Sequence, residues 1–234
     1  EMVGIGSPGI VDNQKKEVIY ASNLYFQNVP IGKMVEDELH KPVFIANDAD
    51  AAAYGEFMAG AGRMKDGKHI SNMLAITLGT GVGGGVVLNG KLLTGCNGAA
   101  AELGHFVIDM HGKECNCGMR GCFEQYGSVT ALIISAGAMA AHKESKLWAL
   151  AENEEANVNG KVILLLDAGD ETAVQVVNTY VHYLCIGVTS IINIFQPEVL
   201  CLGGGISRRS DVLVEPIRAF NAAHGYGRSC PKQP

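Results

Sequence analysis

The sequence has no block of lysine or arginine, and acidic residues outnumber basic ones. It holds 24 Asp and Glu against 18 Lys and Arg, for a formal net charge of −6. A surface without a basic patch is poorly suited to the phosphate backbone of DNA or RNA, so we expect no nucleic-acid partner for this segment. It also has no tandem repeat of about 20–50 residues, the pattern that builds solenoids and propellers.

Long apolar runs are equally scarce. The one stretch of membrane length, Val174–Phe195, is interrupted by polar side chains such as Asn178 and His182, which predicts a buried helix and no membrane span. Hydrophobic residues still make up 47% of the 234 residues, enough for a sizeable core. No secretory leader opens the sequence. The cysteines number seven and suggest no disulfide framework, which indicates a reducing cytosol and a cytoplasmic location.

Strand-like and helix-like stretches alternate, separated by glycine-rich turns, and this order predicts α/β layers. Strands are expected at Met2–Ile5, Val43–Ala46, Asn72–Leu78, Gly83–Leu88 and Val199–Leu202. Helices are expected at Gly32–Leu39, from Asn47 or Asp48 to Ala59, and at Val129–His142, Thr172–Phe195 and Asp211–Ala222. The pair Asn89-Gly90 is typical of a type I′ hairpin turn.

The densest chemistry lies between Glu102 and Glu124, where three cysteines follow the spacing C-x-C-x₄-C downstream of a histidine. Thiolates this close, with one imidazole, suit a closed tetrahedral zinc site. Gly118 and Gly121 permit the tight turns that such spacing demands. The predicted ligands are Cys115, Cys117, Cys122 and His105, with His111 as the competing fourth ligand. The alternative is a loop of reduced cysteines without metal.

Two glycine-rich turns are candidates for binding phosphate. The first, T-L-G-T-G-V-G-G-G from Thr77 to Gly85, lies between two strands, where bare backbone N–H groups and the Thr80 hydroxyl can approach phosphate oxygens. It is neither a Walker A loop nor a Rossmann fingerprint. The second, L-G-G-G-I-S from Leu202 to Ser207, follows a strand and precedes a helix, whose N-terminus could receive a ligand. A purely structural turn is the alternative for both.

Three carboxylates are candidates for hydroxyl chemistry. Asp48 follows Asn47 at a strand-to-helix junction, where the helix N-terminus favours the ionised form that a base requires. Simple helix capping is the alternative for this position. Glu102 and Glu124 flank the cysteines, and carboxylates there could accept paired hydrogen bonds from a polyol; the alternative is solvated loop charge.

Taken in order, these motifs resemble the ROK family (repressor, open reading frame, kinase), which includes bacterial glucokinases. The matching pieces are G-I-G-S-P-G-I-V-D at 4–12, S-N-L at 22–24, N-D-A-D-A-A-A at 47–53, L-G-T-G-V-G-G-G at 78–85, E-L-G-H at 102–105, C-N-C-G-M-R-G-C-F-E at 115–124 and L-G-G-G-I-S at 202–207. The resemblance implies an actin-like, two-lobed sugar kinase fold. It implies residues 1–50 in the small lobe, residues 51–234 in the large lobe, and both ends of the fold truncated.

The resemblance further implies an ATP-dependent hexose kinase that uses zinc, Mg²⁺ and ATP. Asp48 matches the catalytic base that faces the sugar 6-hydroxyl. The matched sugar-binding positions are Asn23, Asn47, Asp48, Glu102, His105 and Glu124. The matched nucleotide-binding positions are Gly79, Thr80, Gly81, Gly83, Gly203, Gly204 and Gly205. His105 would touch both metal and sugar, and a homodimer or homotetramer is implied.

The family's last helices, after the position of Pro234, are absent, and the sequence departs from the family pattern in two further places. The D-x-G-G-T phosphate loop of the family's kinases, which precedes the position of Glu1, is absent, and the glycine usual before the glutamate of E-x-G-H is an alanine. A sugar-sensing repressor of the same family would share the zinc motif, but Asp48 and the G-T-G-V-G turn favour the kinase. A zinc-stapled domain without ligand is a third hypothesis. The hexose is open, because kinases of glucose, N-acetylmannosamine, N-acetylglucosamine, fructose and allose share this scaffold.

Overall fold

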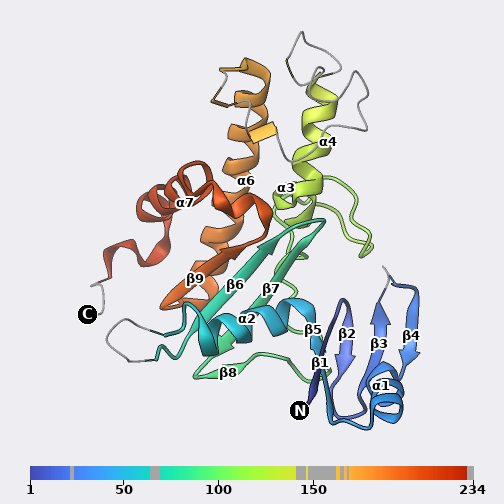
Figure 1. The fold of residues 1–234 in the computed structure, drawn as a ribbon. Helices are drawn as coiled ribbons and strands as arrows, with labels where there is room; N and C mark the ends of the chain where they lie inside the picture. Colours follow the sequence, from blue (N-terminus) through green and yellow to red (C-terminus); the bar gives the residue numbers. More distant parts are fainter. Residues whose placement is uncertain are drawn as a thin grey trace. The chain divides into compact units, whose positions relative to one another are not determined.

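The computed structural model describes residues 1–21, 24–63, 69–140, 146, 162–163, 166–167 and 169–230. Figure 1 shows its helices and strands, and its contacts divide the chain into two units. The first unit holds Glu1–Ile76, Gly84–Glu102 and Pro197–Cys201, and the second holds Thr77–Gly83, Leu103–Gln196 and Leu202–Pro234. The expected lobes, residues 1–50 and 51–234, are continuous segments, whereas these units are assembled from separate segments. The lobe boundary near residue 50 stays a prediction.

The first unit opens with two small sheets and two helices. Strand β1 (Val3–Ser7) pairs in parallel with β5 (Val43–Asn47), and β2 (Ile10–Asp12), β3 (Glu17–Ala21) and β4 (Phe26–Val29) form an antiparallel sheet in that order. Helices α1 (Ile31–Leu39) and α2 (Asp48–Ala59) precede and follow β5. Buried Val18, Ala21 and Ile45 form the core beneath these sheets.

A four-stranded sheet has the order β8-β7-β6-β9 and contributes residues to both units. Its strands are β6 (Met73–Leu78), β7 (Val82–Leu88), β8 (Lys91–Leu92) and β9 (Val199–Gly203). Nearly all of β6 is buried, as its mostly apolar sequence predicts. Asn89 and Gly90 both have positive φ, 52° and 75°, which confirms the predicted turn because a type I′ turn needs φ above zero at both positions.

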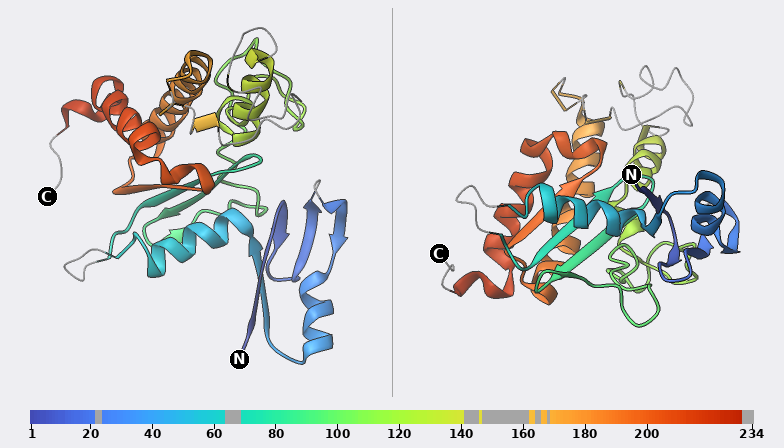
Figure 2. Two further views of the ribbon diagram at one scale, coloured as in Figure 1. Left: turned by 45° about the horizontal axis from the view of Figure 1, so that its top comes forward. Right: turned by 60° about the horizontal axis from the view of Figure 1, so that its bottom comes forward.

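The helices of the second unit are α3 (Glu124–Gly127), α4 (Val129–Ala140), α6 (Glu171–Phe195) and α7 (Ser210–His224). Helix α6 packs against the other three (Figure 2). It begins where the Asp170 carboxylate accepts the Ala173 N–H at 2.9 Å, and ends at Gln196 in the left-handed region before Pro197. The last predicted positions of the 129–142 helix lie outside the described residues. In the described part of the chain, no helix is both long and apolar enough to cross a membrane.

Two glycines inside helices give a matched test of the packing. Gly187 on α6 lies against the ring of Phe123, which is fully buried, so a β-carbon there would collide with the ring. We expect Gly187→Ala to lower the free energy of unfolding by about 1–3 kcal/mol through overpacking. Gly55 on α2 has nothing within 4 Å of the added carbon, so Gly55→Ala should raise it by about 0.5–1 kcal/mol through helix propensity. Urea unfolding measures both, and shifts of the same sign would contradict the packing described.

Candidate functional site

The four predicted metal ligands lie together in the second unit. One ligand atom from each of His105, Cys115, Cys117 and Cys122 falls within 4.8 Å of all the others. Cys115 Sγ is 3.6 Å from His105 Nδ1, and Cys117 Sγ is 3.6 Å from Cys122 Sγ. A tetrahedral zinc centre with Zn–S of about 2.3 Å and Zn–N of about 2.0–2.1 Å has edges of roughly 3.5–3.8 Å, so the cluster fits zinc.

The loop that carries the cysteines is built by tight backbone turns. Cys115 N–H donates to the Met119 carbonyl and Gly118 N–H to the Cys115 carbonyl, both at 2.9 Å. Gly118 and Gly121 have positive φ, 91° and 73°, which confirms the turns expected of these glycines. His105, and not the competing His111, belongs to the cluster. Because the Nδ1 atom of His105 faces the thiols, its Nε2 atom is left for a second partner.

The chemistry of the thiols also suits a cation. Cys115 and Cys122 are buried, whereas Cys117 is exposed. Burial and the neighbouring thiols raise the pKa of Cys122 to about 12, while backbone N–H donors lower the pKa of Cys117. Three thiolates crowded in a partly buried loop repel one another, and a divalent cation removes that repulsion.

The first glycine turn, Gly79–Gly83, joins β6 to β7 and is held at both ends. The Val129 N–H donates to the Gly79 carbonyl at 2.9 Å, and the Glu124 carboxylate accepts the Val82 N–H at 3.0 Å. A side chain at Gly81 would collide with Glu124. Thr80 lies exposed at the tip, and no described residue of the second unit hydrogen-bonds to its hydroxyl. The turn is therefore rigidly anchored and presents a hydroxyl.

The second glycine turn lies against the first, because β9 and β6 are neighbours in the sheet. Gly204 has φ +101° and sits so close to the Leu78 carbonyl that any β-carbon would overlap it. The helix expected at Asp211–Ala222 is present as α7, which begins at Ser210, and the 3₁₀ turn η4 (Gly205–Arg208) lies between it and the glycines. The second turn therefore does not lead straight into a long helix N-terminus.

In the first unit, Asn47 and Asp48 divide two tasks. The Asn47 side chain caps α2, accepting the N–H groups of Ala49 at 2.9 Å and Asp50 at 3.1 Å, and donates to the Gly9 carbonyl at 3.0 Å. Asp48 is exposed and uses one carboxylate oxygen for the Ala49 N–H. Asn47 is the N-cap, and Asp48 shares only the Ala49 N–H with it, so capping accounts for one of the two Asp48 carboxylate oxygens.

Asp50 is a buried carboxyl that sequence reasoning missed. It is 8% exposed, on the first turn of α2. Burial, together with the negative charges of Glu102 and Asp48, raises its pKa to about 6. A perturbed carboxyl beside two others is a recurrent mark of functional sites. The signal in the sequence was the second acid of N-D-A-D, which could equally face solvent.

The predicted site residues are thus distributed over both units. The first unit holds Asn47, Asp48 and Glu102, and the second holds His105, Glu124 and both glycine turns. Glu102 is exposed, and Glu124 begins α3 with one oxygen already bonded to Val82. Asn23 lies outside the described residues.

Comparison with known proteins identifies what this geometry resembles. The model of the ROK family matches residues 1–230. A glucokinase of Halalkalibacterium halodurans is 39% identical over 97% of the chain and 68% of its own length. The xylose repressor of Bacillus subtilis is 30% identical over 97% of the chain and 54% of its own length.

A solved structure of a glucokinase is also similar to this chain. The crystal structure of a ROK family glucokinase from Streptomyces griseus, in complex with glucose and AMPPNP, superposes with a TM-score of 0.86 at 34% identity. The superposition covers 100% of this chain and 74% of the chain of the S. griseus enzyme. The predicted mixed α/β fold of the actin-like sugar kinases is therefore confirmed.

Zinc binding is tested by removing one ligand. We expect about one zinc per chain in purified protein, and Cys122→Ser should hold less than about a tenth of an equivalent, because losing a thiolate opens the closed site. Cys96→Ser is the matched control, since Cys96 is exposed and outside the cluster. Elemental analysis measures the zinc. Wild-type protein with less than half an equivalent, or zinc lost with His111→Ala and kept with His105→Ala, would contradict the assignment.

The buried Asp50 predicts a pH-dependent stability. Folding raises the pKa of this carboxyl from 3.8 to about 6, so its ionised form destabilises the folded state. The free energy of unfolding therefore falls as pH rises from about 4 to 6, and the full loss is present above pH 6. Asp50→Asn should therefore raise the free energy of unfolding by about 1–3 kcal/mol at pH 8. The gain should shrink toward zero near pH 4. Urea unfolding at the two pH values measures this, and an equal gain at both would show that ionisation is not the cause.

Proposed function

The chain belongs to the ROK family, and from that membership we propose that it forms part of an ATP-dependent hexose kinase of the glucokinase type. The observation that carries the proposal is Asp48: it is exposed at the start of α2, where Asn47 is the N-cap, and only one of its carboxylate oxygens accepts a helix N–H. Glucokinase relatives at 39–40% identity support it. The glucose and AMPPNP in the structure of the S. griseus enzyme indicate the ligands to test first.

The chemical step follows from Asp48. We propose that its carboxylate orients the sugar 6-hydroxyl and accepts its proton as O6 forms a bond to the γ-phosphorus and the bond to the β-phosphate oxygen breaks, releasing ADP. The carboxylate oxygen that does not hold the Ala49 N–H would do this work. Since phosphoryl transfer has a loose transition state, orientation contributes more than proton abstraction.

The remaining predicted residues bind the two substrates. We propose that Asn47, Glu102, His105 and Glu124 contact sugar hydroxyls. The anchored turns Gly79–Gly83 and Gly203–Gly205 would receive the nucleotide, with the Thr80 hydroxyl and turn N–H groups as donors. Mg²⁺ would neutralise phosphate charge when bound with ATP.

Zinc, when bound, would fix the loop from His105 to Glu124. His105 would bind it through Nδ1 and could then present Nε2 to a sugar hydroxyl, since Nδ1 is the atom that faces Cys115. The metal would hold the sugar-binding loop in place without entering the phosphoryl transfer.

A sugar-responsive repressor is the second candidate, favoured by the match to the xylose repressor over nearly the whole chain. The two functions differ in turnover: a repressor would bind sugar and release no ADP. A coupled ADP-release assay on the full-length protein over a hexose panel, beside calorimetry with the same sugars, separates them. Sugar binding without ADP release would favour the repressor.

Asp48→Asn tests the proposed base. We expect turnover to fall by roughly 10²-fold or more, because general-base catalysis is worth that much, while sugar affinity stays within several-fold. Asp37→Asn is the control: it removes an equal charge from the exposed surface of α1 and should leave turnover unchanged. If Asp48→Asn turns over like wild type, Asp48 is not the base.

A further inference from the structure

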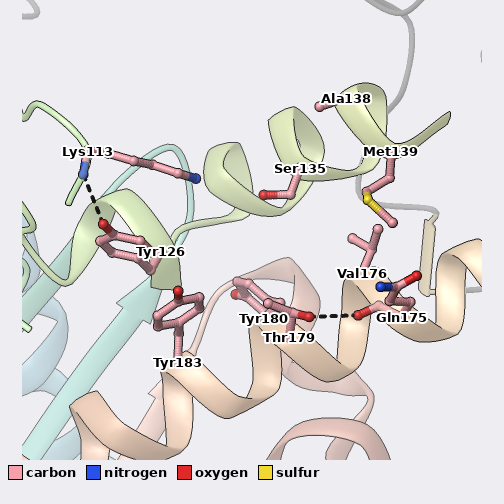
Figure 3. Close-up of a pocket in the computed structure, with 10 residues that line it drawn as sticks. All are labelled: Lys113, Tyr126, Ser135, Ala138, Met139, Gln175, Val176, Thr179, Tyr180 and Tyr183. Carbon is pink, nitrogen blue, oxygen red and sulfur yellow. Dashed lines mark hydrogen bonds between the residues drawn. The ribbon is translucent and has the colours of Figure 1, made fainter. Parts of the chain in front are cut away.

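A cavity of about 310 Å³ lies in the second unit, between α4 and α6, with α3 and Lys113 at one end (Figure 3). None of its lining residues is among those predicted to bind zinc, sugar or nucleotide. Its volume falls at the small end of the range of ligand pockets, which suits a small molecule and not a polypeptide. The function proposed above leaves it without a role.

One wall of the cavity is aromatic and held in place. The rings of Tyr126 and Tyr183 lie 4.5 Å apart between centroids. Tyr180 is buried and donates its hydroxyl to the Gly127 carbonyl at 2.9 Å. The Tyr126 hydroxyl accepts the backbone N–H of Lys113 at 2.9 Å. Such fixed rings offer flat apolar area to a ligand at little cost in conformational entropy.

The polar groups left available in the cavity are donors. The Lys113 ammonium lies 5.2 Å from the centre of the Tyr126 ring and 3.4 Å from the Gln125 carbonyl, a long hydrogen bond. Among the described residues that line the cavity none carries a carboxylate, and no ion pair joins Lys113 to another described residue. In the described part of the chain, the hydroxyls of Ser135 and Tyr183, which both line the cavity, have no hydrogen-bond partner. The Asp109 carboxylate accepts the Tyr126 hydroxyl at 3.4 Å but is not among the described lining residues. A cation and two hydroxyls at the cavity favour an anion.

We propose that this cavity binds a small organic anion. Its carboxylate or phosphate would pair with Lys113 and the Ser135 hydroxyl, and its ring or apolar body would lie against Tyr126 and Tyr183. In Figure 3 the side chain of Lys113 points toward the part of α4 that carries Ser135, and its ammonium lies 5.2 Å from the centre of the Tyr126 ring.

The walls of the cavity lead to the glycine turn. Helix α3 begins at Glu124, which holds the Val82 N–H, and α4 begins at Val129, which holds the Gly79 carbonyl. A ligand that shifts either helix therefore changes an anchor of the turn. This consequence rests on the proposed nucleotide role of the turn, whereas the binding itself does not.

Calorimetric titration of the full-length protein tests the site. The probes are phenyl phosphate, benzoate and, as the neutral analogue, benzamide. We expect at least one anion to bind with Kd of about 1 mM or tighter, and benzamide at least about ten-fold more weakly, because charge pairing contributes at least that factor. Absence of saturable binding by both anions, or equal affinity for benzamide, overturns the proposal.

Variants locate the binding in the cavity. Lys113→Gln should weaken the anion at least about ten-fold with zinc content unchanged, and Ala138→Phe should abolish binding by filling the cavity. Ile134→Phe, an exposed position on the same helix outside the lining, should bind as wild type. Unfolding midpoints of all three must match wild type. Phenyl phosphate that ATP displaces and that Ala138→Phe still binds would lie in the nucleotide site, and would overturn the proposal.

Discussion

The hydrogen bond from the Val82 N–H to the Glu124 carboxylate is the constraint on which the second unit depends. Glu124 follows Cys122 by two residues, so a metal that fixes Cys122 also fixes the start of α3. Through Glu124 that rigidity reaches the turn between β6 and β7, and the Val129 N–H holds the other side of the same turn. The cysteine loop and the glycine turn are thus one mechanical assembly, although a single hydrogen bond contributes only about 1 kcal/mol. Its value lies in position more than in energy.

In the first unit, acidic side chains lie close together at the start of a helix. The α2 N-terminus carries Asp48 and Asp50, with Glu102 close enough to raise the pKa of Asp50. The helix dipole favours negative charge at this end, but burial of Asp50 acts more strongly and in the opposite direction. The exposed Asp48 remains accessible to a substrate, and the effect of burial and like charge falls on the pKa of Asp50.

Much of this could be predicted from local sequence. The zinc ligands are close in the chain, and short spacing leaves little freedom for Cys115, Cys117 and Cys122, so their clustering followed from the pattern. Helix α6 and the Asn89-Gly90 turn likewise depend on periodicity and backbone preference. What could not be predicted depends on distant contacts. Nothing local indicates that Glu124 meets Val82, that Asp50 is buried, or that residues Pro197–Cys201 join the first unit.

The contact between Gly81 and Glu124 has a consequence for how such sequences diverge. A side chain at position 81 would overlap the Glu124 carboxylate, so the end of that side chain would have to move. We expect a relative with alanine or serine at the position of Gly81 to hold its residue at the position of Glu124 in another rotamer or to replace it, and so to lose the hydrogen bond to the Val82 amide. Covariation of these two sites across many sequences would therefore record whether the glycine turn is still held from α3.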